Sequence, residues 1–227
     1  MTLKLYGNLV SQPTRAVAWL MKVKGVSYEL VPVAPPRVGV TPEFLKMNPN
    51  GFVPVIKDGD FTLFEGNAIL TYLAEKHKWA DEYPTELQAR AKVNQYLHWH
   101  HTNARLGTIS VLRPYARREQ NAATPESLEM LKNKDATISK FVGILEQLFA
   151  APYIAESKQA TLADFACYCE LDQLELMDVF DFSKYPKTAD WMLLMKASGA
   201  DIPYHDEVRV PLHEFLTKFN LKPAKKD

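Results

Sequence analysis

The pattern of apolar residues changes once along the chain, and this change sets the expected architecture. Up to His77, short stretches of alternating apolar and polar residues take turns with helical repeats. Beyond residue 86 almost every repeat is helical. We therefore expect an α/β domain at residues 1–78, a proline-terminated linker at 79–86 and an all-helical domain at 87–227.

The first domain is expected to contain strands and helices in the order β-α-β-α-β-β-α. The expected strands are residues 3–6, 28–33, 52–56 and 61–64. The expected helices run from Gln12 to the stop at Gly25, over 41–46 and over 65–77. Pro54 cannot donate a backbone hydrogen bond. The third strand is therefore expected to lie at an edge of the sheet, to contain a bulge, or to begin with an unusual peptide bond.

Five helical patterns follow in the second domain. They cover residues 87–106, 127–149, 162–176, 188–196 and 211–219, with a polar tail at 222–227. The pattern at 162–176 is the most apolar, and we expect it at the centre. Thr161 and Asp164 have the spacing of a capping box, which predicts a buried helix start.

Charge and cysteine content narrow the class of function. The chain has 27 Lys and Arg against 27 Asp and Glu and no long basic run, which argues against nucleic acid as the main partner. Two cysteines cannot form a disulfide scaffold, and no apolar run reaches the ~20 residues of a membrane span. The N-terminus lacks the apolar stretch of a signal peptide, so we expect none. We expect a cytoplasmic protein.

A series of short motifs covers nearly the whole chain. They are Ser11-Gln12-Pro13-x-Arg15, Asn48-Pro49-x-Gly51-x-Val53-Pro54, Asp58-Gly59, Glu65-x-x-Ala68-Ile69-x-x-Tyr72-Leu73, Leu87-Gln88-Ala89-Arg90-Ala91 and Thr161-x-Ala163-Asp164. Their order resembles that of the cytosolic glutathione transferases, most closely the theta class. The resemblance implies a thioredoxin-like first domain, a cis peptide before Pro54, a homodimer, and glutathione as co-substrate with no separate cofactor.

Ser11 is the catalytic residue that the resemblance implies. Lowering the pKa of a thiol from about 8.5 to about 6.5 needs about 2.7 kcal/mol of preferential stabilisation of the anion. The hydroxyl of Ser11 and the N-terminus of the following helix could provide it together. The alternative role of Ser11 is an ordinary helix N-cap. Tyr6 is a competing hydroxyl, but it falls inside a strand, where an aromatic residue usually serves packing.

The resemblance also implies the residues that bind glutathione. The backbone of Val53, shaped by Pro54, would hold the cysteinyl part, and Glu65 would meet the γ-glutamyl ammonium. The γ-glutamyl carboxylate would bind at Gly66, and Asn103 would reach the glutathione of the partner subunit.

Three positions depart from the family pattern. Gly66 replaces the usual Ser or Thr, Phe52 replaces a usual Lys, Arg or Gln, and the segment around Gly39 lacks the usual His. Arg37 could substitute for that His. A missing hydroxyl at Gly66 would cost about 0.5–1.5 kcal/mol, so Gly66→Ser is expected to tighten glutathione binding.

The electrophile is expected between the domains. Leu9, Val10, Arg105 and Ile109 would line its pocket, with Arg113, Tyr115, Trp191 and Phe215 as further candidates. Arg105 could attract an anionic leaving group or the thiolate, or it could form a salt bridge between helices.

Metal chemistry is not expected. Only His98 and His101 share a helix face among three nearby histidines, and no further ligand completes a metal shell. Cys167 and Cys169 lie in the apolar helix and are predicted to be buried, inert thiols.

Two functions lead at this point, and a domain used for protein assembly ranks third. The first is a glutathione transferase that attaches the thiolate to small hydrophobic electrophiles such as halides and peroxides. The alternative is a non-catalytic relative that binds glutathione conjugates, hydrophobic ligands or a protein partner, and the three departures favour it.

Overall fold

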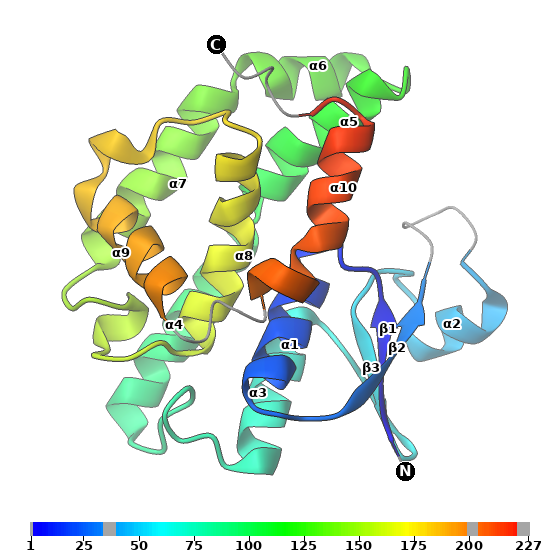
Figure 1. Ribbon diagram of the computed structural model, residues 1–227, viewed down its shortest axis with the longest axis vertical. Coiled ribbons are helices and arrows are strands. Elements are labelled where there is room, and N and C mark those ends of the chain that lie inside the picture. The colour runs from blue at the N-terminus through cyan, green and yellow to red at the C-terminus, as the bar shows by residue number, and fades with distance from the viewer. Residues whose placement is uncertain (1, 34–39, 199–203, 222–227) are drawn as a thin grey trace.

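A mixed sheet and a larger group of helices make up the computed structural model, which describes residues 2–33, 40–198 and 204–221 (Figure 1). The first elements are β1 (Leu3–Gly7), α1 (Gln12–Val23), β2 (Tyr28–Pro32), α2 (Pro42–Met47), β3 (Val55–Asp58), β4 (Phe61–Phe64) and α3 (Gly66–His77). This is the expected order, and the thioredoxin-like prediction is confirmed.

The four strands lie side by side in the order β2-β1-β3-β4. β1 pairs in parallel with β2 and antiparallel with β3, which in turn pairs antiparallel with β4. The strand predicted from residue 52 begins only at Val55, because Pro54 has no N–H to donate to the ladder.

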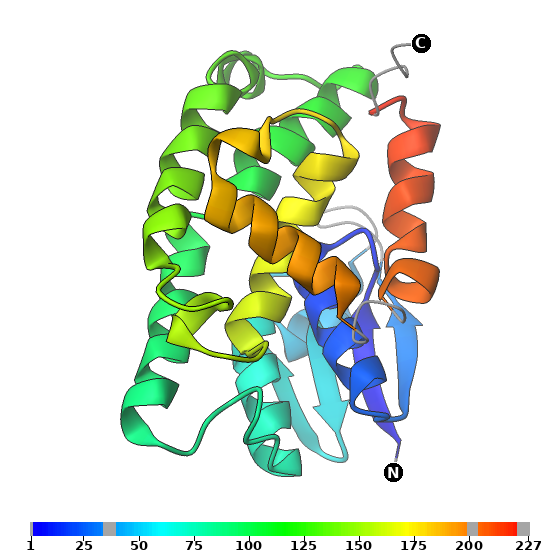
Figure 2. The same cartoon turned by 60° about the vertical axis from the view of Figure 1, so that its left-hand side comes forward.

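Helix α1 lies between the sheet and the helical part of the molecule, as Figure 2 shows. Every residue from Thr14 to Met21 is buried, and all of them except Thr14 and Arg15 are apolar. This position places the N-terminus of α1 where the two parts of the molecule meet.

The second part of the chain is helical apart from its connections. Its elements are α4 (Leu87–Thr102), η1 (Gly107–Leu112), α5 (Arg113–Glu119), α6 (Pro125–Lys132), α7 (Lys134–Leu148), η2 (Ile154–Glu156), α8 (Leu162–Leu176), η3 (Phe182–Lys184), α9 (Pro186–Ala197), η4 (Tyr204–Val208) and α10 (Val210–Lys218). Figure 2 shows the other helices arranged around α8.

Helix α8 is the centre of the helical part, as predicted. Its residues from Leu162 to Leu174 are all buried. At its start, Asp164 accepts hydrogen bonds from the backbone N–H of Thr161 at 2.7 Å and from the Thr161 hydroxyl at 2.9 Å. The reach of this aspartate back to the cap residue is therefore confirmed.

The prediction of a helix over residues 87–106 is wrong at the C-terminal end, because the helix is shorter. α4 stops at Thr102, and Asn103 takes a non-helical conformation (φ −127°, ψ −86°). The side-chain amide of Asn103 donates to the carbonyl of Trp99 at 2.9 Å, which helps to close the helix. The chain then continues into the π-helical turn η1.

The single helix predicted over residues 127–149 is also wrong, because it consists of α6 and α7. Asn133 ends α6 by donating its side-chain amide to the carbonyl of Glu129 at 3.0 Å. α6 begins before residue 127 because the hydroxyl of Thr124 accepts the N–H of Ser127 at 3.2 Å. No pattern in the sequence predicted α5.

The predicted linker 79–86 connects α3 to α4 and packs closely, since Tyr83 is buried and Glu82 accepts the N–H of Leu162 at 2.9 Å. Its role as a domain boundary stays a prediction.

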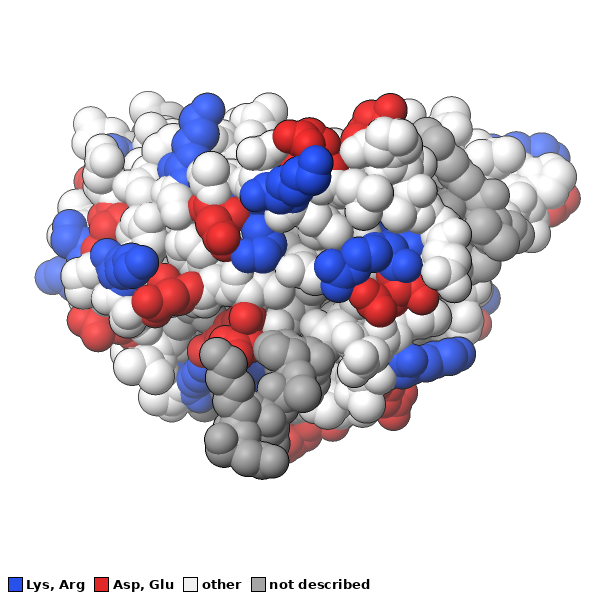
Figure 3. All heavy atoms as spheres, turned by 90° about the horizontal axis from the view of Figure 1, so that it is seen from above, with Lys and Arg blue, Asp and Glu red and all other residues white. Residues whose placement is uncertain are grey.

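On the face of the molecule in Figure 3, charges of both signs are interspersed. Within the described residues, no helix is long and apolar enough to cross a bilayer. The tail 222–227, Arg37 and Gly39 lie outside the described residues.

Candidate active site

Ser11 occupies the N-cap of α1 without acting as an ordinary cap. Its backbone N–H donates to the carbonyl and to the side-chain oxygen of Asn8, each at 3.1 Å. Among the described residues, its hydroxyl makes no capping hydrogen bond to the helix. The half-buried hydroxyl is therefore available beside the N–H groups of the first turn of α1, which carry partial positive charge.

Tyr6 carries the competing hydroxyl. It belongs to β1, and its backbone lies between the two neighbouring strands of the sheet. It lies opposite Val31 of β2 and opposite Val55 of β3, so its backbone is part of the sheet. Ser11 instead sits in the connection between β1 and α1, where a side chain can approach a ligand.

The peptide bond between Val53 and Pro54 is cis, as predicted. Val53 is half-buried and Pro54 is buried, directly before β3. The side-chain amide of Asn48 donates to the carbonyl of Phe52 at 2.8 Å and shapes the preceding turn. The backbone of Val53 is thus presented by a well-fixed segment, while the side chain of Phe52 is exposed.

Glu65 and Gly66 form the start of α3. Glu65 is exposed and has a positive φ of 72°, an uncommon conformation for a residue with a side chain. Gly66 is buried against α1, and a Cβ atom at this position would lie 2.8 Å from the Cβ of Pro13. The glycine therefore lets the N-termini of α1 and α3 approach each other.

The contact with Pro13 overturns the expectation for Gly66→Ser. A serine would have to displace the ring of Pro13, which belongs to the first turn after Ser11. We now expect this substitution to disturb the site. The close pair of helix N-termini that the glycine permits is itself suited to binding anionic groups.

Arg105 forms a salt bridge, as in one of its two predicted roles, but it does so from the turn between α4 and η1. Its guanidinium lies 3.3 Å from the carboxylate of Glu170, which is completely buried in α8. The same guanidinium donates to the side-chain oxygen of Gln12 at 3.2 Å. Arg105 is thus held next to the first residue of α1, and Glu170 compensates its charge.

The carboxylate of Glu170 also explains the π-helical turn η1. It accepts the backbone N–H of Thr108 at 2.6 Å, and the amide of Gln173 donates to both Glu170 and the hydroxyl of Thr108. A helix whose N–H groups bond outside the helix can widen locally, as π-turns do. The neighbouring Ile109 is exposed.

Val10 joins a hydrophobic cluster separate from the main core. The buried members of this cluster are Leu112, Met177, Leu212, Leu216 and Leu221, and Tyr115 and Phe215 pack against it with Val10. Trp191 does not belong to it, because it is buried in the main core and donates its indole N–H to Asp164 at 2.8 Å. Trp191 is therefore no pocket residue.

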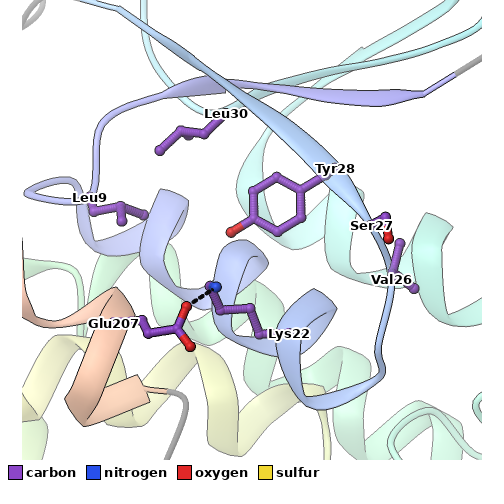
Figure 4. A pocket seen from close by; sticks show the side chains of 7 residues that line it. All are labelled: Leu9, Lys22, Val26, Ser27, Tyr28, Leu30 and Glu207. Atoms are coloured by element: carbon purple, nitrogen blue, oxygen red, sulfur yellow. Dashed lines mark hydrogen bonds and ion pairs between the residues drawn. The ribbon is translucent and has the colours of Figure 1, made fainter.

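Leu9 faces a hollow of about 490 Å³ between α1, β2 and η4. Figure 4 shows its side chain there with Tyr28, Leu30 and the ion pair of Lys22 and Glu207.

Asn103 lies at the end of α4, where its amide also donates to the hydroxyl of Thr102 at 3.1 Å. Its contact with a partner subunit stays a prediction.

Among the histidines and cysteines, His100, Cys167 and Cys169 are buried. No group of three or more potential metal ligands occurs within the part of the chain that the structure describes. His100 is buried, and burial lowers its pKa to about 3. Cys167 and Cys169 are buried and unpaired, and burial raises the pKa of Cys169 to about 12, as expected of inert thiols.

Comparisons with known proteins agree with this geometry. Residues 1–75 match the family described as the N-terminal domain of glutathione S-transferase. The chain is 36% identical to glutathione S-transferase T1 of Arabidopsis thaliana, over 96% of this chain and 90% of that protein.

Two solved human structures extend the comparison. One is glutathione transferase theta-2 in complex with glutathione and an unknown ligand, with a TM-score of 0.85, 31% identity and coverage of 96% and 90% of the two chains. The other is a theta-class enzyme with the glutathione conjugate of 1-menaphthyl sulfate, with a TM-score of 0.83, 32% identity and coverage of 100% and 95%. The chain therefore belongs to the glutathione S-transferase family and is of the theta type.

Proposed function

We propose that the hydroxyl of Ser11 donates a hydrogen bond to the thiolate of glutathione and so activates it for attack on an electrophile. The observation that carries this proposal is a hydroxyl at a helix N-terminus that makes no capping hydrogen bond among the described residues. A hydrogen bond to an anion contributes about 1.5–3 kcal/mol. With the helix dipole added, this is enough to lower the pKa of the thiol by about two units.

The reaction is the attack of the glutathione thiolate on a small hydrophobic electrophile, such as a halide or a peroxide. With an organic peroxide, the thiolate attacks the O–O bond, an alcohol leaves, and a second glutathione converts the sulfenic acid that forms into the disulfide and water. With an alkyl halide, the sulfur forms a bond to carbon and the halide leaves with the bonding electron pair. The electrophile binds beside Arg105 and Ile109, and the loop of Leu9 and Val10 before Ser11 lies on the other side of it. Arg105 supplies positive charge near a leaving anion, moderated by Glu170.

Glutathione is bound by the segment that carries the cis peptide and by the start of α3. The backbone of Val53 before Pro54 pairs with the cysteinyl part, and Glu65 binds the γ-glutamyl ammonium. The backbone N–H of Gly66 binds the γ-glutamyl carboxylate, since a helix N-terminus favours an anion. Asn103 contacts the glutathione of a second subunit in a homodimer.

The protein acts on small molecules in the cytoplasm and needs no metal or other cofactor. Two free, buried cysteines suit a reducing compartment.

Ser11→Ala and Tyr6→Phe test the assignment of the hydroxyl. We expect Ser11→Ala to raise the pKa of bound glutathione and to lower turnover by about 100-fold, the usual cost of one donor to a developing anion. Tyr6→Phe is expected to change neither. The thiolate absorbance of bound glutathione, titrated against pH in both variants, measures the effect, and the reverse ranking would refute the assignment.

A panel of electrophiles tests whether the protein is catalytic. Turnover with at least one alkyl or aryl halide or peroxide supports the transferase. Binding of glutathione without turnover of any electrophile would support the non-catalytic alternative.

A further inference from the structure

Arg15 is the only charged residue in the buried stretch of α1 from Thr14 to Met21. Its side chain is completely buried. One terminal nitrogen, Nη1, donates to the carbonyl oxygen of Val10 at 2.7 Å and to that of Leu9 at 3.3 Å. These are the two peptide groups directly before Ser11, so a single guanidinium holds the loop that carries the hydroxyl.

The other terminal nitrogen of Arg15 binds α8. Nη2 donates to the carbonyl of Cys169 at 2.9 Å and to the side-chain oxygen of Gln173 at 3.2 Å. Because α8 is the buried central helix, the loop before Ser11 is tied to one of the best-packed elements of the molecule. Only the planar fork of an arginine can bridge two such sets of acceptors.

A second buried cluster lies on the same helix α8 and is formed by Asp172 with Tyr204 and Arg209 of the C-terminal segment. The hydroxyl of Tyr204 donates to Asp172 at 2.8 Å, and the guanidinium of Arg209 lies 2.8 Å from the same carboxylate. Asp172 is completely buried.

The pKa values of Arg15 and Asp172 are shifted by burial and by the charged groups around them. Burial opposes the charged form of Arg15, but nearby Tyr204, Cys169 and Asp172 raise its pKa above the usual value. Burial raises the pKa of Asp172, while the charges of Arg209 and Arg15 act in the opposite direction. Arg15 therefore stays charged, and its donors stay directed at the loop.

We propose that Arg15 is a positioning residue for the hydroxyl of Ser11, and that Tyr204, which packs on Trp19 of the same helix and is held by Asp172, supports its position. The proposal rests on the proposed role of Ser11. A donor that stabilises a developing anion must already be in place, and a shift of about 1 Å removes much of its effect. The C-terminal segment thereby influences the thiolate without touching it.

Two variants distinguish the contacts that Arg15 makes from the positive charge that it carries. Arg15→Lys keeps a positive charge but loses the fork that reaches both the loop and α8. Tyr204→Phe keeps the ring that packs on Trp19 and removes the hydroxyl that donates to Asp172. The matched control is Lys24→Met, which breaks an ion pair with Glu82 at the far end of α1.

Each variant is made in the wild type and in the Ser11→Ala background, and the pKa of bound glutathione is measured from thiolate absorbance. We expect Arg15→Lys to raise that pKa by about one unit, the equivalent of one weakened charged hydrogen bond. Tyr204→Phe should cause a smaller rise and Lys24→Met none. In the Ser11→Ala background the rise should vanish, because Arg15 acts through the serine.

Several results would overturn the proposal. If folded Arg15→Lys and Tyr204→Phe keep the wild-type pKa, or if the rise persists in the Ser11→Ala background, Arg15 does not act through Ser11. If Arg15→Lys does not fold, Tyr204→Phe decides alone. If Ser11→Ala by itself leaves the pKa unchanged, the role of Ser11 fails first and the role of Arg15 fails with it.

Discussion

The sheet-bearing part and the helical part of the molecule contribute to the site by different means. In the first part, the groups near the site are a hydroxyl at Ser11, the backbone of Val53 and the start of α3 at Gly66. In the second part they are charged side chains, which are buried and paired. In the proposed site, the first part thus presents groups to glutathione, and the second part holds those groups in place.

Helix α8 shows how the second part does this. It carries three completely buried carboxylates, Asp164, Glu170 and Asp172, and each has its own partners. Asp164 caps the helix, Glu170 binds Arg105 and the turn η1, and Asp172 binds Tyr204 and Arg209. Buried charges of this kind are costly unless every one is paired, which makes their partners testable.

The largest expected effect on stability comes from Glu170→Gln. The change leaves Arg105 without its counter-ion, and breaking a buried ion pair on one side costs about 3 kcal/mol. Urea unfolding measures the loss. The control is Glu156→Gln, which breaks an exposed pair with Lys92 and should cost less than about 1 kcal/mol. Equal losses would contradict the contrast between buried and exposed charges.

A smaller effect is expected from Gly66→Ser in the first part. Overpacking against Pro13 should cost about 2 kcal/mol and weaken glutathione binding. The control is Gly143→Ala in α7, where the nearest atom to an added Cβ is 3.8 Å away and alanine favours the helix by about 1 kcal/mol. Thermal unfolding and calorimetry measure both properties, and tighter glutathione binding by Gly66→Ser would contradict the packing role.

The smallest effect is a pH dependence caused by His100. Its pKa is about 3 because the residue is buried, whereas an unfolded histidine titrates near about 6.5. The unfolded chain therefore gains a proton first as the pH falls, and stability present above about pH 6.5 is lost towards lower pH. From about pH 7 to about pH 5.5 the loss through this residue is about 1 kcal/mol.

Variants of two neighbouring histidines check this effect. His100→Asn should flatten the decrease in unfolding free energy over this pH range, whereas His101→Asn, at an exposed position, should leave it unchanged. The same decrease in wild type and in His100→Asn would show that His100 does not titrate as described.

Much of the first part could be predicted from the sequence, because turns and caps leave local signals. Ser11-Gln12-Pro13 marks the start of α1, and the order of strands and helices follows from alternating patterns. Gly66 shows the limit of this reasoning. Its replacement of a hydroxyl residue suggested a weaker ligand contact, whereas the contact with Pro13 comes from a residue distant in sequence.

The second part was harder to predict, since its important contacts join distant helices. Glu170, Asp172 and Gln173 lie in a stretch that reads as the most apolar of the chain, and their polarity was the one available signal. The end of α4 at Thr102 and the turn η1 depend on Asn103 and on Glu170, which a periodicity cannot reveal. Arg15 was part of a motif, but its four acceptors appear only in the folded chain.

A crystal structure of this protein with glutathione bound is the most direct measurement for the role of Ser11. The account predicts that the sulfur of glutathione lies within hydrogen-bonding distance of the Ser11 hydroxyl, at the N-terminus of α1. A sulfur beyond the reach of that hydroxyl, and in contact with Tyr6 or another group instead, would contradict it.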